Sequence, residues 1–274
     1  MTSRVRLLSP LFIVVLSLIF VVPFLFMFVT AAKNQAEAAQ LSFSLPTEWA
    51  LFQNFADAIK ARDYMLVTAF VNSAFVTVAS VAVVIVLSAL VAYVLQRRPS
   101  KWTRVVDVLI LSGLIIPPAV VPTVWVLQEI NLFKTLTGLI LIEVAFHLSF
   151  CILLFRAFIA TIPRELDEAA TIDGAGPLRV FFSVIFPLLK SVTVTIIVIE
   201  SVNIFNDFVN PLYFLPGDDK PTVQLTLFNF QSQFETQYNL LFADILLITI
   251  PPLIMYIFFN RQIVAGMTSG AVKG

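Results

Sequence analysis

The side chains of this chain that could do chemistry lie inside apolar sequence. Glu143 and His147 are four residues apart, which places them on the same face of a helix. Ionisable groups within a membrane are costly and normally face a cavity or a partner. The pair therefore has two interpretations: a structural histidine satisfied by its neighbour, or a proton relay.

A second polar series runs through the apolar segment after Lys190. Its members are spaced seven, three, four and three residues apart and would share one helix face: Thr193, Glu200, Asn203, Asp207 and Asn210. Such groups can hydrogen-bond a polar solute along a translocation path, or they can tie neighbouring helices together. Glu200 could also pair with a charge on a companion subunit. The candidate path residues are Glu200, Asn203, Asn206, Asp207 and Asn210.

The elements that hold these residues must be membrane spans. Of 274 residues, 59% are hydrophobic and 12% are charged, whereas a soluble domain averages about 25% charged. The formal net charge is zero, so a nucleic-acid-binding surface is not expected. The single cysteine, Cys151, excludes an internal disulfide, and packing is its expected role.

Six apolar segments are long enough for a bilayer, which takes about 20 residues. Helices are expected, because backbone in lipid must satisfy its own hydrogen bonds. The sequence thus predicts an all-α membrane protein with six transmembrane helices in a single domain, 1–274. The predicted spans are 8–32, 67–96, 106–128, 136–158, 190–213 and 238–260. The first is too long for the core of a signal peptide. Pro117, Pro118 and Pro122 should kink or loosen the third.

Lysine and arginine favour the cytoplasmic loops of membrane proteins. With the N-terminus in the cytoplasm, 12 of the 17 basic residues lie inside and 5 lie outside. Both termini are then cytoplasmic, as is the charged loop 161–188. Two long loops, 33–63 and 213–237, would face outside, and the first could be an amphipathic segment at the membrane surface.

The charged loop 161–188 is predicted to contain a short helix. Pro163 suits a first turn, acidic residues follow it, and Gly174 can cap the C-terminus. A helix of about three turns is marginal alone and needs something to pack on. It is either a docking element or an interfacial connection between two spans.

The stretch EAATIDGAGPLRVFFSVIFP, 168–187, resembles the signature of binding-protein-dependent ABC import permeases. The matching residues are Glu168, Ala169, Ala170, Asp173, Gly174, Ala175 and Pro187. Val184 and Phe186 replace the usual Ile and Leu, and Ser191 stands where many relatives have a second proline. Further similarities in the same order are Asn72-Ser73, Ala92-Tyr93, Ile162 to Leu166, Asn206-Asp207-Phe208 and the tail from Gly266. Together they resemble the carbohydrate-uptake branch, close to the maltose-type second permease.

The resemblance implies the type I ABC importer permease fold, with a cytoplasmic coupling helix that seats in an ATPase subunit. Its residues would be Glu168, Ala169, Ala170, Asp173, Gly174 and Ala175. The implied partners are a second permease subunit, two ATP-binding subunits, an extracytoplasmic solute-binding protein, a sugar and membrane lipid. The implied location is the inner or plasma membrane.

The sequence contains no G-x-x-x-x-G-K-[ST] phosphate loop, no nucleophile–base arrangement and no metal-ligand cluster. We therefore expect a non-enzymatic subunit without a catalytic site, metal or cofactor, with ATP and Mg²⁺ on the ATPase. The alternatives are an ABC permease for a glycerol phosphate or polyol, an ion-coupled secondary transporter, and a membrane scaffold without transport. The ion-coupled transporter would use Glu143, His147, Glu200 and Asp207.

Overall fold

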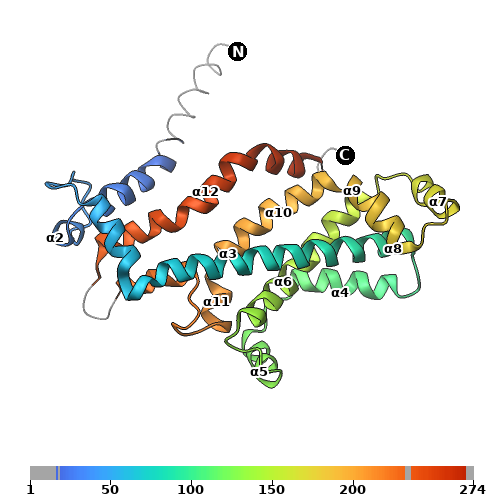
Figure 1. The fold of residues 1–274 in the computed structure, drawn as a ribbon, viewed down its shortest axis with the longest axis horizontal. Helices are drawn as coiled ribbons and strands as arrows, with labels where there is room; N and C mark the ends of the chain where they lie inside the picture. Colours follow the sequence, from blue (N-terminus) through green and yellow to red (C-terminus); the bar gives the residue numbers. More distant parts are fainter. Residues whose placement is uncertain (1–16, 18, 232–235, 270–274) are drawn as a thin grey trace, which may run out of the picture. The chain divides into compact units, whose positions relative to one another are not determined.

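The chain is helical throughout its regular elements, as the sequence predicts (Figure 1). A computed structural model describes residues 17, 19–231 and 236–269. Within this part of the chain no strand occurs, only an isolated bridge between Gln231 and Thr236. The chain divides into two compact units, one of Met1–Ala69 with Val223–Ile250 and the other of Phe70–Thr222 with Pro251–Gly274.

The helices follow one another with short connections. In chain order they are Ile19–Ala31, α2 (Gln35–Ala38), α3 (Leu51–Arg97), α4 (Thr103–Ile115), α5 (Val120–Glu129), α6 (Leu136–Ile159), α7 (Glu165–Ile172), α8 (Pro177–Val180), the π-helix η1 (Phe181–Ile185), α9 (Phe186–Leu188), α10 (Lys190–Phe205), α11 (Val209–Phe214), the 3₁₀-helix η2 (Val223–Phe230) and α12 (Tyr238–Ser269).

Three helical stretches are long and apolar enough to cross a membrane: Leu51–Arg97, Leu136–Ile159 and Tyr238–Phe259. Two bent pairs of helices, α4 with α5 and α8–α9 with α10, pass the same test together. The described residues thus hold three to five candidate spans. The predicted span 8–32 lies partly outside the described residues, so the count of six spans stays a prediction.

Helix α3 is interrupted near its beginning. Ala61 has an extended backbone, and Arg62, Asp63 and Tyr64 have positive φ angles of 46°, 54° and 61°. The left-handed region is unfavourable for side chains other than glycine, so these residues form a turn between two helical stretches. The apolar run that was predicted as the second span follows this turn.

The prolines of the predicted third span interrupt it, and the interruption is a full break between two helices. Helix α4 ends at Ile115, Ile116 is extended with ψ 124°, and α5 leaves at 114° to α4. Pro117 and Pro118 explain the break, because a proline pushes the preceding residue out of the helical region and offers no N–H. Pro122 lies in the first turn of α5, where it is tolerated.

A second bend precedes α10. Pro187 cannot donate to a helical carbonyl, and the turn before it widens into η1, where the amide of Phe186 bonds the carbonyl of Phe181. The axis then turns by 76° at Leu189 between α9 and α10. The predicted fifth span therefore begins with a sharp change of direction.

The core of the second unit surrounds α6, which packs against α4, α10 and α11. Phe155 and Ile159 of α6 are fully buried, together with Phe181 and Ile185 of η1. Gly138 allows the chain before α6 to approach closely, because a Cβ there would lie 2.1 Å from the carbonyl oxygen of Leu132. This packing holds α6 and α10 in fixed register at the polar residues described below.

The first unit contains buried polar side chains that hydrogen-bond one another and the backbone. Lys33 is fully buried and donates to the carbonyl of Ser42 at 2.7 Å. Asn54 donates to the carbonyls of Ala31 and Lys33, and Asn239 of α12 donates to Asn54. Buried polar groups need such partners, so these bonds hold the connection after residue 31 against α3 and α12.

Candidate functional site

Helix α7 is built by its own sequence. Glu165, Asp167 and Glu168 occupy its first turn, where negative charge complements the helix dipole. At its C-terminus Gly174 has a φ of 81°, its amide bonds the carbonyl of Thr171, and the amide of Ala175 bonds that of Ala170. These two bonds form a Schellman motif, which satisfies carbonyls that the helix end would leave open. The helix has eight residues, about two turns rather than the three expected, and Pro163 lies just before its N-cap, Arg164.

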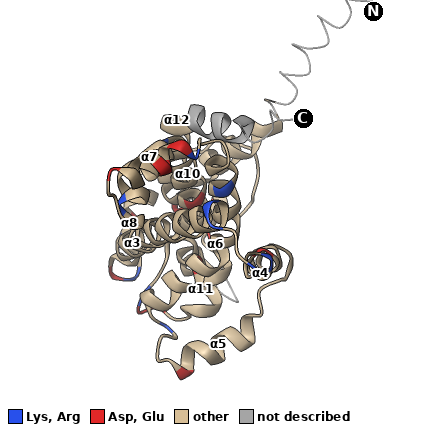
Figure 2. Cartoon of the chain, turned by 90° about the vertical axis from the view of Figure 1, so that its right-hand side faces the viewer, with Lys and Arg blue, Asp and Glu red and all other residues tan. Residues whose placement is uncertain are grey.

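One side of α7 faces outward. Of the predicted coupling residues, Glu168, Ala169, Asp173 and Gly174 are exposed, while Ala170 and Ala175 are half-buried and pack against the core. Ile172, at the C-terminal end of the helix, is 85% exposed. Figure 2 shows charged residues gathered around α7, whereas most of the chain is uncharged. The helix thus presents a mixed apolar and acidic surface.

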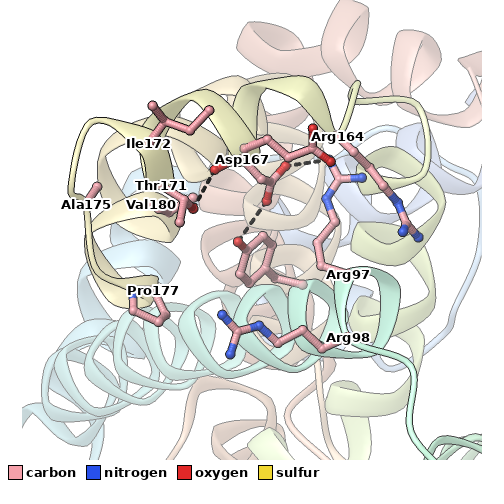
Figure 3. A pocket seen from close by; sticks show the side chains of 11 residues that line it. Arg97, Arg98, Arg164, Asp167, Thr171, Ile172, Ala175, Pro177 and Val180 are labelled. Carbon is pink, nitrogen blue, oxygen red and sulfur yellow. Dashed lines mark hydrogen bonds and ion pairs between the residues drawn. The ribbon is translucent and has the colours of Figure 1, made fainter.

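The inner side of α7 is held by α3. The Tyr93 hydroxyl donates to Asp167 at 2.8 Å, and Arg97 forms an ion pair with Asp167 at 3.2 Å. Figure 3 shows Asp167 and Arg97 pointing toward each other. Both line a pocket of about 470 Å³ whose other lining residues include Pro177 and Val180 of α8. Sequence reasoning missed this site: it used Asp167 only as a helix-terminal charge, and no local signal connects it to α3.

A larger cavity, of about 920 Å³, lies where α4 breaks into α5. One wall is the apolar turn that carries Pro117 and Pro118, and the other walls come from α6 and α10. The polar lining groups are Ser112, His147, Asn203, Asn206, Asp207 and Asn210. Four of the five predicted path residues thus line one cavity.

The polar series does not follow a single helix. Helix α10 ends at Phe205, and α11 begins at Val209. Asp207 lies in the break and accepts from the amides of Val209 and Asn210, at 2.8 and 3.3 Å. This carboxylate therefore caps α11, and the break brings Asn206 and Asp207 into the cavity wall.

Glu200, the fifth predicted path residue, lies behind the cavity wall. It is 1% exposed, and one of its carboxylate oxygens lies 2.6 Å from His147 Nδ1. His147 Nε2 lies 3.4 Å from the carboxylate of Glu143, which is equally buried. The imidazole, which lines the cavity, thus joins two buried carboxylates from α6 and α10.

Amides and a thiol complete this cluster. Asn203 donates to Glu200 at 3.3 Å, Asn210 donates to Glu143 at 3.2 Å, and the Cys151 thiol donates to Glu200 at 3.4 Å. Among the described residues, no group of three or more His, Cys, Asp or Glu side chains is arranged to hold a metal ion. The arrangement satisfies two carboxylates inside an apolar bundle and leaves amides, Asp207 and the imidazole edge toward the cavity.

The chain matches a known family over most of this region. The model of the family described as binding-protein-dependent transport system inner membrane component matches residues 85–268. The melibiose/raffinose/stachyose import permease protein MelC of Bacillus subtilis is 32% identical over 92% of this chain and 91% of its own length. The diacetylchitobiose uptake system permease protein NgcG of Streptomyces coelicolor is 31% identical over 98% of this chain and 90% of its own.

A solved structure has the same fold. It belongs to a bacterial ABC transporter involved in the import of the acidic polysaccharide alginate, and it matches with a TM-score of 0.81 and 21% identity. The match covers 94% of this chain and 96% of the other.

Proposed function

Because the chain belongs to the family of binding-protein-dependent transport system inner membrane components, we propose that its cavity carries a sugar or oligosaccharide across the membrane. The chain is a multi-pass membrane subunit of an ABC importer, and it is not itself the ATPase. In the proposed complex the chain pairs with a second permease, and two ATP-binding subunits bind on the cytoplasmic side. An extracytoplasmic solute-binding protein delivers the sugar.

The polar lining of the cavity is the observation that supports a sugar as the transported solute. The Ser112 hydroxyl, the asparagine amides and Asp207 supply both donors and acceptors, which sugar hydroxyls require, and the apolar wall can contact the ring faces. Several relatives are named as permeases for sugars, including melibiose, raffinose and diacetylchitobiose.

A phosphate-bearing solute, which the sequence left as an alternative, fits this lining less well. None of the described lining residues is a lysine or arginine, and Asp207 would repel an anion. Ion-coupled transport would need His147 to exchange protons with the cavity. Both of its ring nitrogens already face buried carboxylates, which disfavours this alternative.

Helix α7 is the proposed coupling helix. Its exposed residues Glu168, Ala169, Asp173 and Gly174 would contact the ATPase, while Ala170 and Ala175 keep it on the core. Three arginines lie beside it, Arg97, Arg98 and Arg164, which supports a cytoplasmic position for this end of the bundle. Both termini are then cytoplasmic.

Purification of the complex from native membranes in mild detergent tests the assembly. The chain should bring down an ATPase, a second permease and the binding protein, and Glu168→Lys should lose the ATPase. Glu129→Lys makes the same charge change on exposed α5 and should retain it.

Reconstituted complex then tests the sugar, with labelled raffinose, diacetylchitobiose and malto-oligosaccharides as probes. We expect ATP-dependent uptake of at least one of them. Uptake that survives ATP depletion and collapses a proton gradient would refute the ABC mechanism for this chain.

A further inference from the structure

The contact between α7 and α3 has a position that suits transmission of movement. We propose that Asp167, Tyr93 and Arg97 form the link through which displacement of α7 reaches α3 and, along α3, the polar cluster. The inference rests on the proposed role of α7 as the coupling helix. It assigns positioning roles to residues that do not themselves face the exposed side of α7.

Helix α7 packs against α8 and η1, and Ala170 contacts the core, but among the described residues its side-chain bonds to other elements reach only α3. None of its residues is buried, and eight residues are too few for an independently stable helix. Its side-chain bonds to other elements run to α3: the two contacts of Asp167, and the N-cap Arg164, which donates to the carbonyl of Gln96 at 3.3 Å. A displacement of α7 therefore acts on the last turn of α3 as well as on α8 and η1.

The link is sheltered from solvent. The side chains of Arg97 and Asp167 are 7% and 17% exposed, and Tyr93 is 8% exposed. An ion pair so placed is screened less than a surface pair, and a hydroxyl that donates to a carboxylate makes a charge-assisted bond. The contact thus ties α7 to the last turn of α3.

Tyr93 and Arg97 each hold a second element. The Arg97 guanidinium also donates to the carbonyl of Ile162 at 2.8 Å, in the connection before α7. The Tyr93 ring packs on Phe181 of η1, with ring centroids 5.3 Å apart. The link therefore contacts the segments on both sides of α7. In our proposal, loop 161–188 moves together with α3.

The far part of α3 reaches the polar cluster. Ser73 and Val76 line a small pocket together with Glu143 and Asp207. Asn72, near the same level, donates to the carbonyl of Pro221 at 2.9 Å. From Asn72 to Arg97 the helix is continuous over about 37 Å, at 1.5 Å per residue. A single rigid helix thus contacts both α7 and the back of the cavity cluster.

The experiment measures whether nucleotide still changes the accessibility of the cavity when the contact between Asp167 and α3 is removed. The parent protein is the assembled transporter with Ala145→Cys, an exposed alanine of the cavity lining. Its reaction rate with a membrane-impermeant maleimide is measured without nucleotide and with ATP trapped by vanadate. The chain without this substitution gives the background from Cys151.

In the parent, we expect the two labelling rates to differ by about fivefold or more, the lower end of usual coupling between sites. Asp167→Asn should keep the ATPase in the complex and keep hydrolysing ATP, while the ratio of rates falls toward one. Glu165→Gln removes an exposed carboxylate from the same turn and should keep the parent ratio. An unchanged ratio in Asp167→Asn would overturn the link.

Tyr93→Phe leaves α7 intact and removes one hydroxyl on α3. It should lower the ratio in the same direction, and the double variant with Asp167→Asn should be no worse than Asp167→Asn alone. Independent, additive losses would overturn the link while leaving the proposed function standing. A parent complex that contains no ATPase would instead refute the proposed function and the link with it.

Discussion

His147 Nδ1, on α6, lies 2.6 Å from a carboxylate oxygen of Glu200, on α10. Glu200 is only 1% exposed. The other ring nitrogen faces Glu143, so one imidazole satisfies two buried carboxylates. This cross-link fixes α6 to α10 at the wall of the cavity.

His147→Leu should destabilise the protein by about 3 kcal/mol, because it leaves buried carboxylates without their partner. The thermal unfolding midpoint of the purified complex in detergent measures the loss. Phe146→Leu, a neighbour in the same cavity wall without such contacts, serves as the control. Adding Glu200→Gln to His147→Leu should recover part of the loss; if it lowers the midpoint further, buried charge is not the cause.

Asn203→Ala should raise the KM for the transported sugar about fivefold, since one hydrogen bond contributes about 1 kcal/mol. The initial rate of ATP-dependent uptake into proteoliposomes measures it. Val202→Ala changes the adjacent residue of the same lining and should leave KM unchanged. A lower amount of folded protein with an unchanged KM would assign Asn203 to helix packing rather than to the path.

Gly174→Ala should weaken the C-terminus of α7 by about 1 kcal/mol, because alanine is strained at a φ of 81°. A Cβ meets nothing within 4 Å at either Gly174 or Gly176, and Gly176 has an ordinary φ of −68°. Gly176→Ala is therefore the matched control. Amide exchange across 165–175 should quicken only in Gly174→Ala, and equal exchange in both variants would show that the left-handed cap does not hold α7.

Gly138→Ala should destabilise the protein by about 2 kcal/mol or more, since its Cβ would lie 2.1 Å from the backbone oxygen of Leu132. At Gly113 the corresponding atom is the side-chain oxygen of Ser149, at 2.5 Å, which can rotate away. Gly113→Ala should therefore lower the thermal midpoint less. The reverse order of the two midpoints would contradict the close approach before α6.

Local sequence was sufficient for the helical class and for the presence of a short helix at α7. Long apolar runs without charges leave the backbone no alternative to internal hydrogen bonds in lipid, so the all-helical class could be predicted and is confirmed. The acidic first turn and Gly174 specify where α7 begins and ends, because capping acts between residues a few positions apart. The family signature in 168–187 is equally local, and it led to the family that the comparisons confirm.

Local sequence was less informative where prolines and polar residues share a segment. Pro117 and Pro118 predicted a disturbance, but whether a helix kinks or turns by 114° depends on what it packs against. Likewise, the prediction that the residues from Glu200 to Asn210 share one face assumed one continuous helix. The break at Asp207 instead separates Glu200 behind the wall from Asn206 and Asp207 on it.

The helical class, the polar residues of the bundle and a capped, charged helix between two apolar segments all follow from local sequence. Which of these residues meet depends instead on the packing of the helices. His147 joins Glu200, and Asp167 joins Tyr93 across 74 positions, because the packing of α6, α10 and α3 brings them together. Periodicity assigns a residue to a face of its own helix, but the partner across that face depends on how whole helices pack.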